Sequence, residues 1–233
     1  MKNIEIFKRV EQKYVLSEKQ YKDLMKLISN HLSEDEYFKS NICNIYFDSD
    51  NFDLIINSLE KGYYKEKVRL RSYNVPNLKD KVYFEIKSKL DGVVYKRRVT
   101  INLNDYYDYL NGKSIKSSNK QIMNEIDYVI KKYDLKPKYF IAYDRLSYYD
   151  KRDESFRITF DENIRSRNDE LRLEYGDSGK LYFDDKKYIM ELKCNGGLPM
   201  YFINALSKLK IYPSSFSKYG NIYKDSIKEE VYV

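Results

Sequence analysis

The stretch Lys67-Val68-Arg69-Leu70-Arg71 alternates cationic and apolar residues. Successive side chains of a β-strand point to opposite faces, so the three cations are predicted to share one face and the two apolar residues the other. Three cations on one strand face repel one another unless water or an anion lies beside them. Taken alone, such a strand is most simply interpreted as the solvated face of an antiparallel sheet, and an anion-binding face is the alternative.

The same alternation recurs along the chain. It is found in Arg9-x-Glu11-x-Lys13, Glu85-x-Lys87-x-Lys89, Lys96-x-Arg98, Arg157-x-Thr159-x-Asp161 and Glu191-x-Lys193. A sheet whose strands carry mostly positive charge on one face is typical of a protein in which that face encloses and binds a polyanion. About eight such strands with few helices predict an α+β fold: a closed antiparallel β-barrel with flanking helices, in a single domain over residues 1–233.

The charge and the cysteine content narrow the class of protein. The 233 residues carry a formal net charge of +7, which favours an anionic partner. The cations follow alternating strand positions and not one long helix, so nucleic acid is not expected to be that partner. Cys43 and Cys194 are far apart and are expected to be free thiols in a reducing compartment. No apolar run approaches the roughly 18 residues of a membrane span, so we expect a cytoplasmic protein without a transmembrane segment.

The single histidine, His31, excludes a Ser-His-Asp triad, a Cys-His pair and multi-histidine zinc sites. The sequence also lacks the GxxxxGK[ST] phosphate-binding loop and the dinucleotide-binding fingerprint. Phosphates would therefore be held by side chains, and a metal by carboxylates and substrate oxygens, which favours magnesium or manganese. The cations with suitable strand positions are Arg69, Arg71, Arg145, Arg157, Lys13, Lys87, Lys96, Lys193 and Lys218.

Glu191 is a carboxylate among cations, and two interpretations stay open for it. It could bind a divalent cation that bridges to phosphate, or it could form an internal salt bridge to Lys193 or to an arginine. Glu11 and Glu85 are weaker metal-ligand candidates and are expected to be structural partners of neighbouring cations.

Nine segments in order resemble one known family, and together they cover nearly the whole chain. They are RVEQKYVL (9–16), NIYFDS (44–49), KVRLRSY (67–73), FEIKSK (84–89), VVYKRR (93–98), AYDRLSY (142–148), RITFDENIRSR (157–167), IMELK (189–193) and FSKYG (216–220). This series is similar to the VTC domain, named after the vacuolar transporter chaperone, a polyphosphate polymerase. That domain belongs to the triphosphate tunnel metalloenzyme superfamily.

The resemblance implies a basic β-tunnel that binds ATP and triphosphate or polyphosphate and transfers the γ-phosphate of ATP to a growing polyphosphate chain, with Mn²⁺ or Mg²⁺. The phosphate-binding catalytic set that it implies is Lys13, Arg69, Arg71, Lys87, Lys96, Arg145, Arg157 and Lys218, with Glu191 as the metal ligand. Lys193, Arg98, Tyr219 and Glu11 are implied as neighbouring substrate-binding residues.

One position departs from the superfamily. The wider superfamily often begins with Glu-x-Glu-x-Lys, and this chain has Arg9 at the first position, which favours a polymerase over a simple triphosphatase. Hydrolysis of inorganic or nucleoside triphosphate, or non-catalytic binding of polyphosphate or nucleotide, remain the alternatives.

Overall fold

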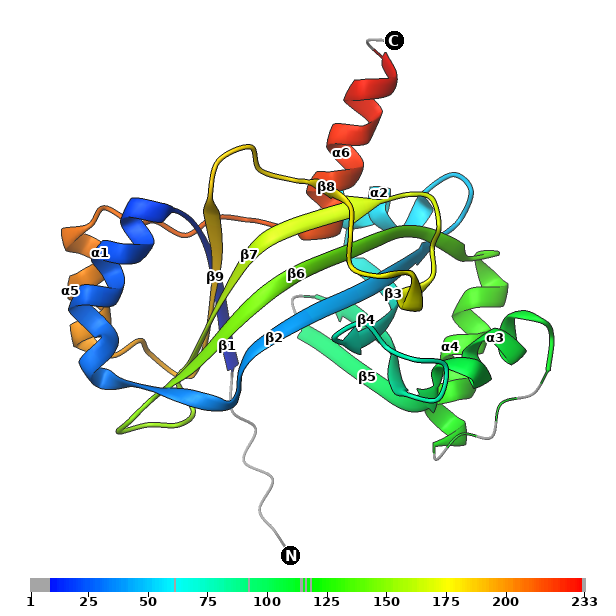
Figure 1. Ribbon diagram of the computed structural model, residues 1–233, viewed down its shortest axis with the longest axis horizontal. Helices are drawn as coiled ribbons and strands as arrows, with labels where there is room; N and C mark the ends of the chain where they lie inside the picture. Colours follow the sequence, from blue (N-terminus) through cyan, green and yellow to red (C-terminus); the bar gives the residue numbers. More distant parts are fainter. Residues whose placement is uncertain are drawn as a thin grey trace, which may run out of the picture. The chain divides into compact units, whose positions relative to one another are not determined.

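The computed structural model describes residues 9–231 except 61, 92, 114, 116 and 118, and this part of the chain has an α+β fold (Figure 1). Its strands are β1 (Arg9–Ser17), β2 (Leu32–Asp48), β3 (Tyr64–Tyr73), β4 (Lys81–Leu90), β5 (Val93–Asn102), β6 (Lys136–Asp150), β7 (Arg157–Arg167), β8 (Lys180–Leu181) and β9 (Lys187–Asn195). Its α-helices are α1 (Glu18–Ile28), α2 (Asp53–Leu59), α3 (Leu103–Leu110), α4 (Lys120–Lys132), α5 (Met200–Lys208) and α6 (Lys218–Val231). Two short 3₁₀-helices cover Ser29–His31 and Leu173–Tyr175.

The strands form one antiparallel sheet in the order β1-β9-β7-β6-β2-β3-β4-β5, and β8 pairs with β7. The α+β class and the antiparallel sheet predicted from the sequence are therefore confirmed. Among the described residues the hydrogen-bonded path begins at β1 and ends at β5, so the predicted closure into a barrel is not shown.

Two compact units divide the chain. The first unit comprises Met1–Ser40, Tyr143–Asn163 and Phe183–Phe216, and the second comprises Asn41–Ala142, Ile164–Tyr182 and Ser217–Val233. Each unit has its own hydrophobic core. The strands β2, β6 and β7 contribute residues to both units. Each unit therefore provides its own stretch of sheet, and its charged face is described separately below.

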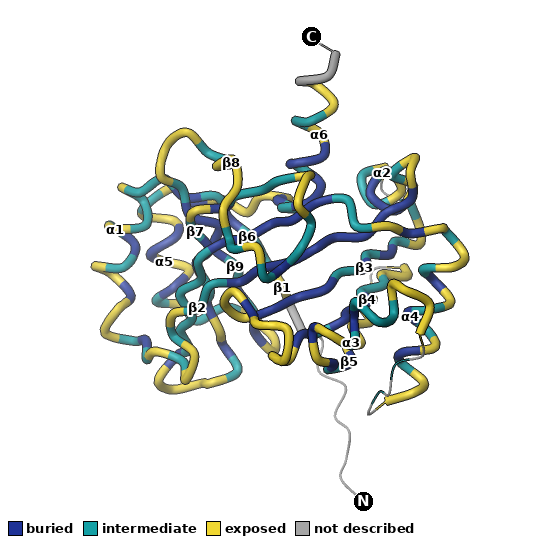
Figure 2. The backbone as a smooth tube through the Cα atoms, turned by 45° about the vertical axis from the view of Figure 1, so that its right-hand side comes forward, coloured by how far each residue is buried: buried dark blue, intermediate teal, exposed yellow. Residues whose placement is uncertain are grey.

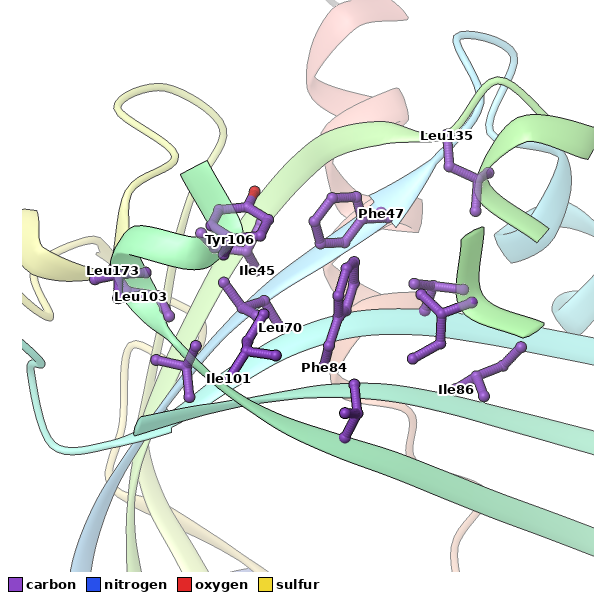
Figure 3. Packing of buried hydrophobic residues seen from close by; sticks show 14 of the residues in the cluster. Ile45, Phe47, Leu70, Phe84, Ile86, Ile101, Leu103, Tyr106, Leu135 and Leu173 are labelled. Atoms are coloured by element: carbon purple, nitrogen blue, oxygen red, sulfur yellow. The ribbon is translucent and has the colours of Figure 1, made fainter. Parts of the chain in front are cut away.

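The core of the second unit lies between its strands and the helices α3 and α4 (Figure 3). Val68 and Leu70 are fully buried in it, as the alternation of the central stretch predicts. Phe84 lies at its centre, with its ring centroid 5.4 Å from that of Phe47 and 6.0 Å from that of Tyr106. Burial of this apolar face leaves the opposite face of the same strands for polar and charged side chains.

The core of the first unit lies between β1, β7 and β9 on one side and the adjacent helices α1 and α5 on the other (Figure 1). A capping box begins α1: the Ser17 hydroxyl accepts from the Gln20 N–H, and the Gln20 side chain accepts from the Ser17 N–H. The Tyr21 ring stacks on that of Tyr188 at 4.0 Å. These contacts fix the apolar face of β9, so Glu191 and Lys193 lie on its other face.

The last helix, α6, begins at Lys218. The long strand β2 begins at Leu32, and its first half is much more exposed than its second (Figure 2). The turn between β4 and β5 begins at Asp91, whose φ is 45°, and Gly92 lies outside the described residues. None of the helices described is both long and apolar enough to cross a membrane.

Candidate functional site

The second unit carries a group of charged side chains on the sheet face opposite its core. We call this group the Arg69 cluster; its members are Tyr46 from β2, Lys67, Arg69 and Arg71 from β3, Glu85 and Lys87 from β4, and Lys96 and Arg98 from β5. The alternation in each strand, combined with the antiparallel register, places all of these residues on one face. The structure thus brings together five of the predicted site residues: Arg69, Arg71, Lys87, Lys96 and Arg98.

Three lysines form one row across this face. Lys67 lies opposite Lys87, and Lys87 lies opposite Lys96 on the next strand. Like charges directly opposite one another on neighbouring strands are destabilising. Lys67 donates to the Ser217 hydroxyl at 3.1 Å, whereas Lys87 has neither a hydrogen bond nor an ion pair with any residue that the structure describes. Lys96 pairs with Glu85, so within the described part of the chain Lys87 at the centre of the row is the lysine without such a partner.

Glu85 is the carboxylate of the Arg69 cluster and is only 2% exposed. Its Oε2 accepts from Arg69 Nε at 2.7 Å, and its Oε1 lies 2.9 Å from Lys96 Nζ. Burial opposes ionisation of Glu85, but the charges of Arg69, Arg71 and Lys96 lower its pKa to about 2. Burial in turn lowers the pKa of Lys96, and Glu85 opposes that shift. As the sequence predicted, Glu85 is a structural partner of neighbouring cations.

Two β2 residues belong to this face although the sequence analysis did not select them. Arg69 Nη1 donates to the Tyr46 hydroxyl at 3.1 Å, and Arg71 Nε donates to the Asn44 side-chain oxygen at 2.9 Å. The Asn44 amide in turn donates to the backbone oxygen of Ile141 at 3.0 Å. The signal was present in the sequence, because Asn44, Tyr46 and Asp48 alternate with Ile45 and Phe47.

Lys218 and Tyr219, the predicted residues of the FSKYG segment, lie at the start of α6. Tyr219 is only 2% exposed, and its hydroxyl donates to Asp48 Oδ2 at 2.8 Å, so its oxygen is engaged within the protein. The Tyr219 ring stacks on that of Tyr46 at 4.8 Å. Tyr219 thus supports the Arg69 cluster from behind Tyr46.

The first unit carries a second charged face, which we call the Glu191 cluster. Its members are Glu11 and Lys13 from β1, Arg145 from β6, Arg157, Thr159 and Asp161 from β7, and Glu191 and Lys193 from β9. Glu191 lies opposite Lys13 on one side and Thr159 on the other, and Lys193 lies opposite Glu11 and Arg157. Six predicted site residues are therefore brought together in this unit: Glu11, Lys13, Arg145, Arg157, Glu191 and Lys193.

Glu191 is held by two lysines in this structure. Its Oε1 lies 2.5 Å from Lys193 Nζ, and its Oε2 lies 3.8 Å from Lys13 Nζ. Burial opposes ionisation of Glu191, but the charges of Lys193, Lys13 and Arg145 lower its pKa to about 2. The internal salt bridge considered from the sequence is present, and the ionised carboxylate that a metal ligand requires is present as well.

The two arginines of the Glu191 cluster are held very differently. Arg145 forms a two-pronged contact with the fully buried Asp161, from Nε at 2.6 Å and from Nη2 at 2.8 Å. Arg157 has about half of its side chain exposed, and its Nη1 lies 3.5 Å from Asp35 Oδ2. The sequence analysis noted the alternation that contains Asp161 but did not identify Asp161 as the partner of Arg145.

Glu191 and Thr159 carry oxygens of the kind that hard divalent cations prefer as ligands. Among the residues described here, no three His, Cys, Asp or Glu side chains gather into a metal-binding group. Mg²⁺ needs no such group, because it commonly uses one or two carboxylates together with substrate phosphates and water. Thr159 lies opposite Glu191, and its hydroxyl oxygen is buried without a hydrogen-bond partner in the structure. A bound ion, water or phosphate would satisfy that oxygen.

Comparison with known proteins agrees with this geometry. The family model described as "VTC domain" matches residues 8–226, whereas curated proteins gave no match. A putative adenylate cyclase from Bacillus halodurans superposes with a TM-score of 0.55 at 16% identity, over 90% of this chain and 93% of its own. A putative adenylyl cyclase from Hippeastrum, described as having a dominant triphosphatase activity, superposes with a TM-score of 0.52 at 13% identity, over 93% of this chain and 96% of its own. These two similarities show a shared fold, and the match over nearly the whole chain shows that the protein belongs to the VTC domain family.

Proposed function

We propose that the protein is a metal-dependent phosphotransferase that moves the γ-phosphate of ATP onto a growing inorganic polyphosphate chain. The observation that carries the proposal is the row Lys67–Lys87–Lys96, three like charges on adjacent strands of one face. Such a row is unfavourable for an empty sheet and favourable for one that binds a chain of phosphates. Membership of the VTC domain family supports the same substrate class.

Phosphoryl transfer needs mainly positioning and charge stabilisation, which cations provide without a histidine. The Arg69 cluster supplies arginines that form two-pronged contacts to phosphate and lysines that act as point charges. Closure of the sheet into a barrel around the polyphosphate is part of this proposal. A cytoplasmic location, where ATP is available, is also part of it, and both cysteines are buried and free, as expected of a reducing compartment.

Glu191, with Glu11 nearby on β1, is proposed to hold Mn²⁺ or Mg²⁺. Glu11 Oε1 and Glu191 Oε2 lie 3.9 and 3.8 Å from the same nitrogen, Lys13 Nζ. A divalent ion there would neutralise charge that develops on the transferred phosphoryl group. The protein residues themselves bind the phosphates, orient them and keep Glu191 ionised.

Triphosphate hydrolysis is the second candidate, and the triphosphatase activity described for the Hippeastrum protein favours it. One experiment separates the two. The protein is incubated with ATP and MnCl₂, polyphosphate is resolved on a gel, and released phosphate is measured in parallel with inorganic triphosphate as substrate. Polyphosphate ladders support the polymerase, whereas phosphate release without polymer supports the triphosphatase.

Two lysine variants serve as controls for this assay. Lys87→Ala removes a cation from the row and should reduce either activity. Lys22→Ala removes an exposed lysine of α1, which pairs with Glu18, and should leave both activities unchanged. Binding of triphosphate without either activity would contradict an enzyme and support a binding module.

A further inference from the structure

Tyr46 places an uncharged proton donor directly against Arg69, in the middle of the Arg69 cluster. It lies opposite Arg69 in the register and is 7% exposed, while its neighbours Ile45 and Phe47 face the core. Its ring is fixed from behind by the stacked ring of Tyr219, 4.8 Å away. The phenol therefore has a fixed position on the charged face of the sheet.

The charged side chains around the Tyr46 hydroxyl are hydrogen-bond donors. Its oxygen accepts a hydrogen bond from Arg69 Nη1 at 3.1 Å, and the other charges that act on it belong to Lys67 and Arg71. Arginine and lysine side chains cannot accept a hydrogen bond. The proton of the phenol finds no acceptor among the residues that the structure describes, and a buried donor left in this condition costs free energy.

The other ionisable groups nearby do not supply that acceptor. Glu85 on β4 is engaged by Arg69 and Lys96, and Asp48 on β2 accepts the hydroxyl of Tyr219. Burial, then Asp48, raise the pKa of Tyr219 far above its ordinary value, so Tyr219 keeps its proton throughout the neutral and alkaline range. An anion bound by the neighbouring guanidinium would offer an oxygen that can accept this proton.

We infer that Tyr46 is a substrate-binding residue whose hydroxyl donates a hydrogen bond to a phosphate oxygen held by Arg69. This inference rests on the proposed function for its substrate class, a triphosphate or polyphosphate chain. Only the neutral phenol can donate this bond, and a phenolate would repel the substrate. The contact therefore makes binding sensitive to pH through one tyrosine.

The direction of this pH dependence follows from the charges around the phenol. Burial alone would raise the pKa of Tyr46, but Arg69 and Arg71, with Lys67 further off, lower it to about 8. Bound phosphate adds negative charge and shifts the pKa upward again. Affinity for triphosphate should consequently fall as the pH rises through about 8, and triphosphate should keep the phenol protonated to a higher pH.

Tyr46→Phe tests the inference, because it keeps the ring and its stacking on Tyr219 and removes only the hydroxyl. Binding of inorganic triphosphate is measured by calorimetry at about pH 6.5 and about pH 9.5, on either side of the Tyr46 pKa. At each pH the affinity of wild type is divided by that of Tyr46→Phe, and the two ratios are compared. Protonation of triphosphate itself affects both proteins equally and therefore cancels in each ratio. Tyr139→Phe is the matched control: Tyr139 has the same 7% exposure and lies in the same unit, and its hydroxyl donates to Ser226 at 2.7 Å.

We expect Tyr46→Phe to weaken binding about tenfold at the lower pH, as for one hydrogen bond to a charged acceptor. At the higher pH the variant should bind as well as wild type or more tightly, because it lacks the repulsive phenolate. The tyrosinate absorbance difference between wild type and Tyr46→Phe should report one group that titrates near pH 8 and moves upward when triphosphate is added. Equal affinities at the lower pH, or a loss that is the same at both pH values, would overturn the inference. If Arg157→Ala abolishes triphosphate binding and Tyr46→Phe does not weaken it, the inference about Tyr46 is wrong and the proposed function stands. If the wild-type protein does not bind triphosphate at all, the proposed function is wrong as well.

Discussion

At the scale of single residues, the Glu191 cluster uses arginine in two ways. Arg145 is held rigidly within the protein, and Arg157 is left half open to solvent. The guanidinium of Arg145 is fixed by two hydrogen bonds to a carboxylate with no solvent exposure. That of Arg157 is half exposed, and its ion pair among the described residues is a long contact to Asp35. A rigidly held arginine organises the site, while a loosely held one is available to a ligand.

Arg157→Ala should weaken triphosphate binding by about 1.5–3 kcal/mol, the usual range for a hydrogen bond to a charged group, with little change in thermal stability. Arg145→Ala should lower stability instead, by about 3–5 kcal/mol, because it removes the bidentate partner of a buried carboxylate. Calorimetric titration and chemical denaturation of the two variants measure both quantities. Unchanged affinity in a folded Arg157→Ala protein would place Arg157 outside the binding site.

Glu191→Gln keeps size and hydrogen-bonding capacity and removes the negative charge between Lys13 and Lys193. The variant should lose stability at neutral pH, because two lysines and Arg145 lose their shared anion. The pKa of Glu191 is about 2 in the folded protein and about 4.3 in an unfolded chain, so its contribution is fully present above about pH 5. The stability gap between wild type and variant should therefore narrow as the pH falls from about 5 towards 2.

The metal role of Glu191 is tested with the same variant. Turnover with Mn²⁺ should fall by orders of magnitude, while metal-free ATP binding should stay the same or tighten because a repulsive charge has gone. Weaker metal-free binding with unchanged turnover per bound ATP would instead identify Glu191 as a salt-bridge partner only.

At the scale of elements, the short helix α2 depends on a residue outside it. Asp48, at the end of β2, accepts hydrogen bonds from the backbone N–H groups of Ser49, Leu54 and Ile55 and from the Tyr219 hydroxyl. The first N–H groups of a helix have no partners within the helix, and a carboxylate satisfies them. This one buried side chain therefore joins β2, α2 and α6.

Asp48→Ala should destabilise the second unit by roughly 3 kcal/mol, because several buried donors lose their acceptor together. It should also reduce triphosphate affinity, since the Tyr219 ring that supports Tyr46 is no longer anchored. Chemical denaturation and calorimetry measure the two effects. Asp50→Ala is the control: Asp50 lies two residues further on, is exposed, pairs with Lys136 and Lys138, and should change neither quantity measurably.

The elements also show what the sequence could and could not predict. The alternation of cationic and apolar residues correctly predicted the two faces of β3. Side chains of a strand point to the two faces in turn, so burial of Val68 and Leu70 places the cations between them on the other face. It could not predict that Glu85 would face Arg69, or that Asp161 would face Arg145, because pairing partners depend on register and on which strands are neighbours.

At the scale of the whole molecule, the net charge of +7 and the grouping of cations on strand faces make stability depend on anions. A ligand that binds the folded state stabilises it by mass action, and a polyanion also relieves repulsion among the cations. Inorganic triphosphate should therefore raise the melting temperature, and this rise should shrink between about 0.05 M and about 0.5 M NaCl as screening increases. An equal rise with sodium chloride at matched ionic strength would indicate general screening without a binding site.

The pairing of β1 with β9 has a consequence for how the protein is made. β1 leaves the ribosome well before its hydrogen-bonding partner β9, because most of the described residues lie between the two strands in sequence. At a synthesis rate of roughly 5–20 residues per second, the edge of β1 stays unpaired for on the order of ten seconds or more before β9 emerges. Contacts so distant in sequence also slow folding, because the loop must close before they contribute. Nascent chains of this protein should consequently need a chaperone that covers the unpaired edge of β1, and the first unit should become protease-resistant only after β9 has emerged.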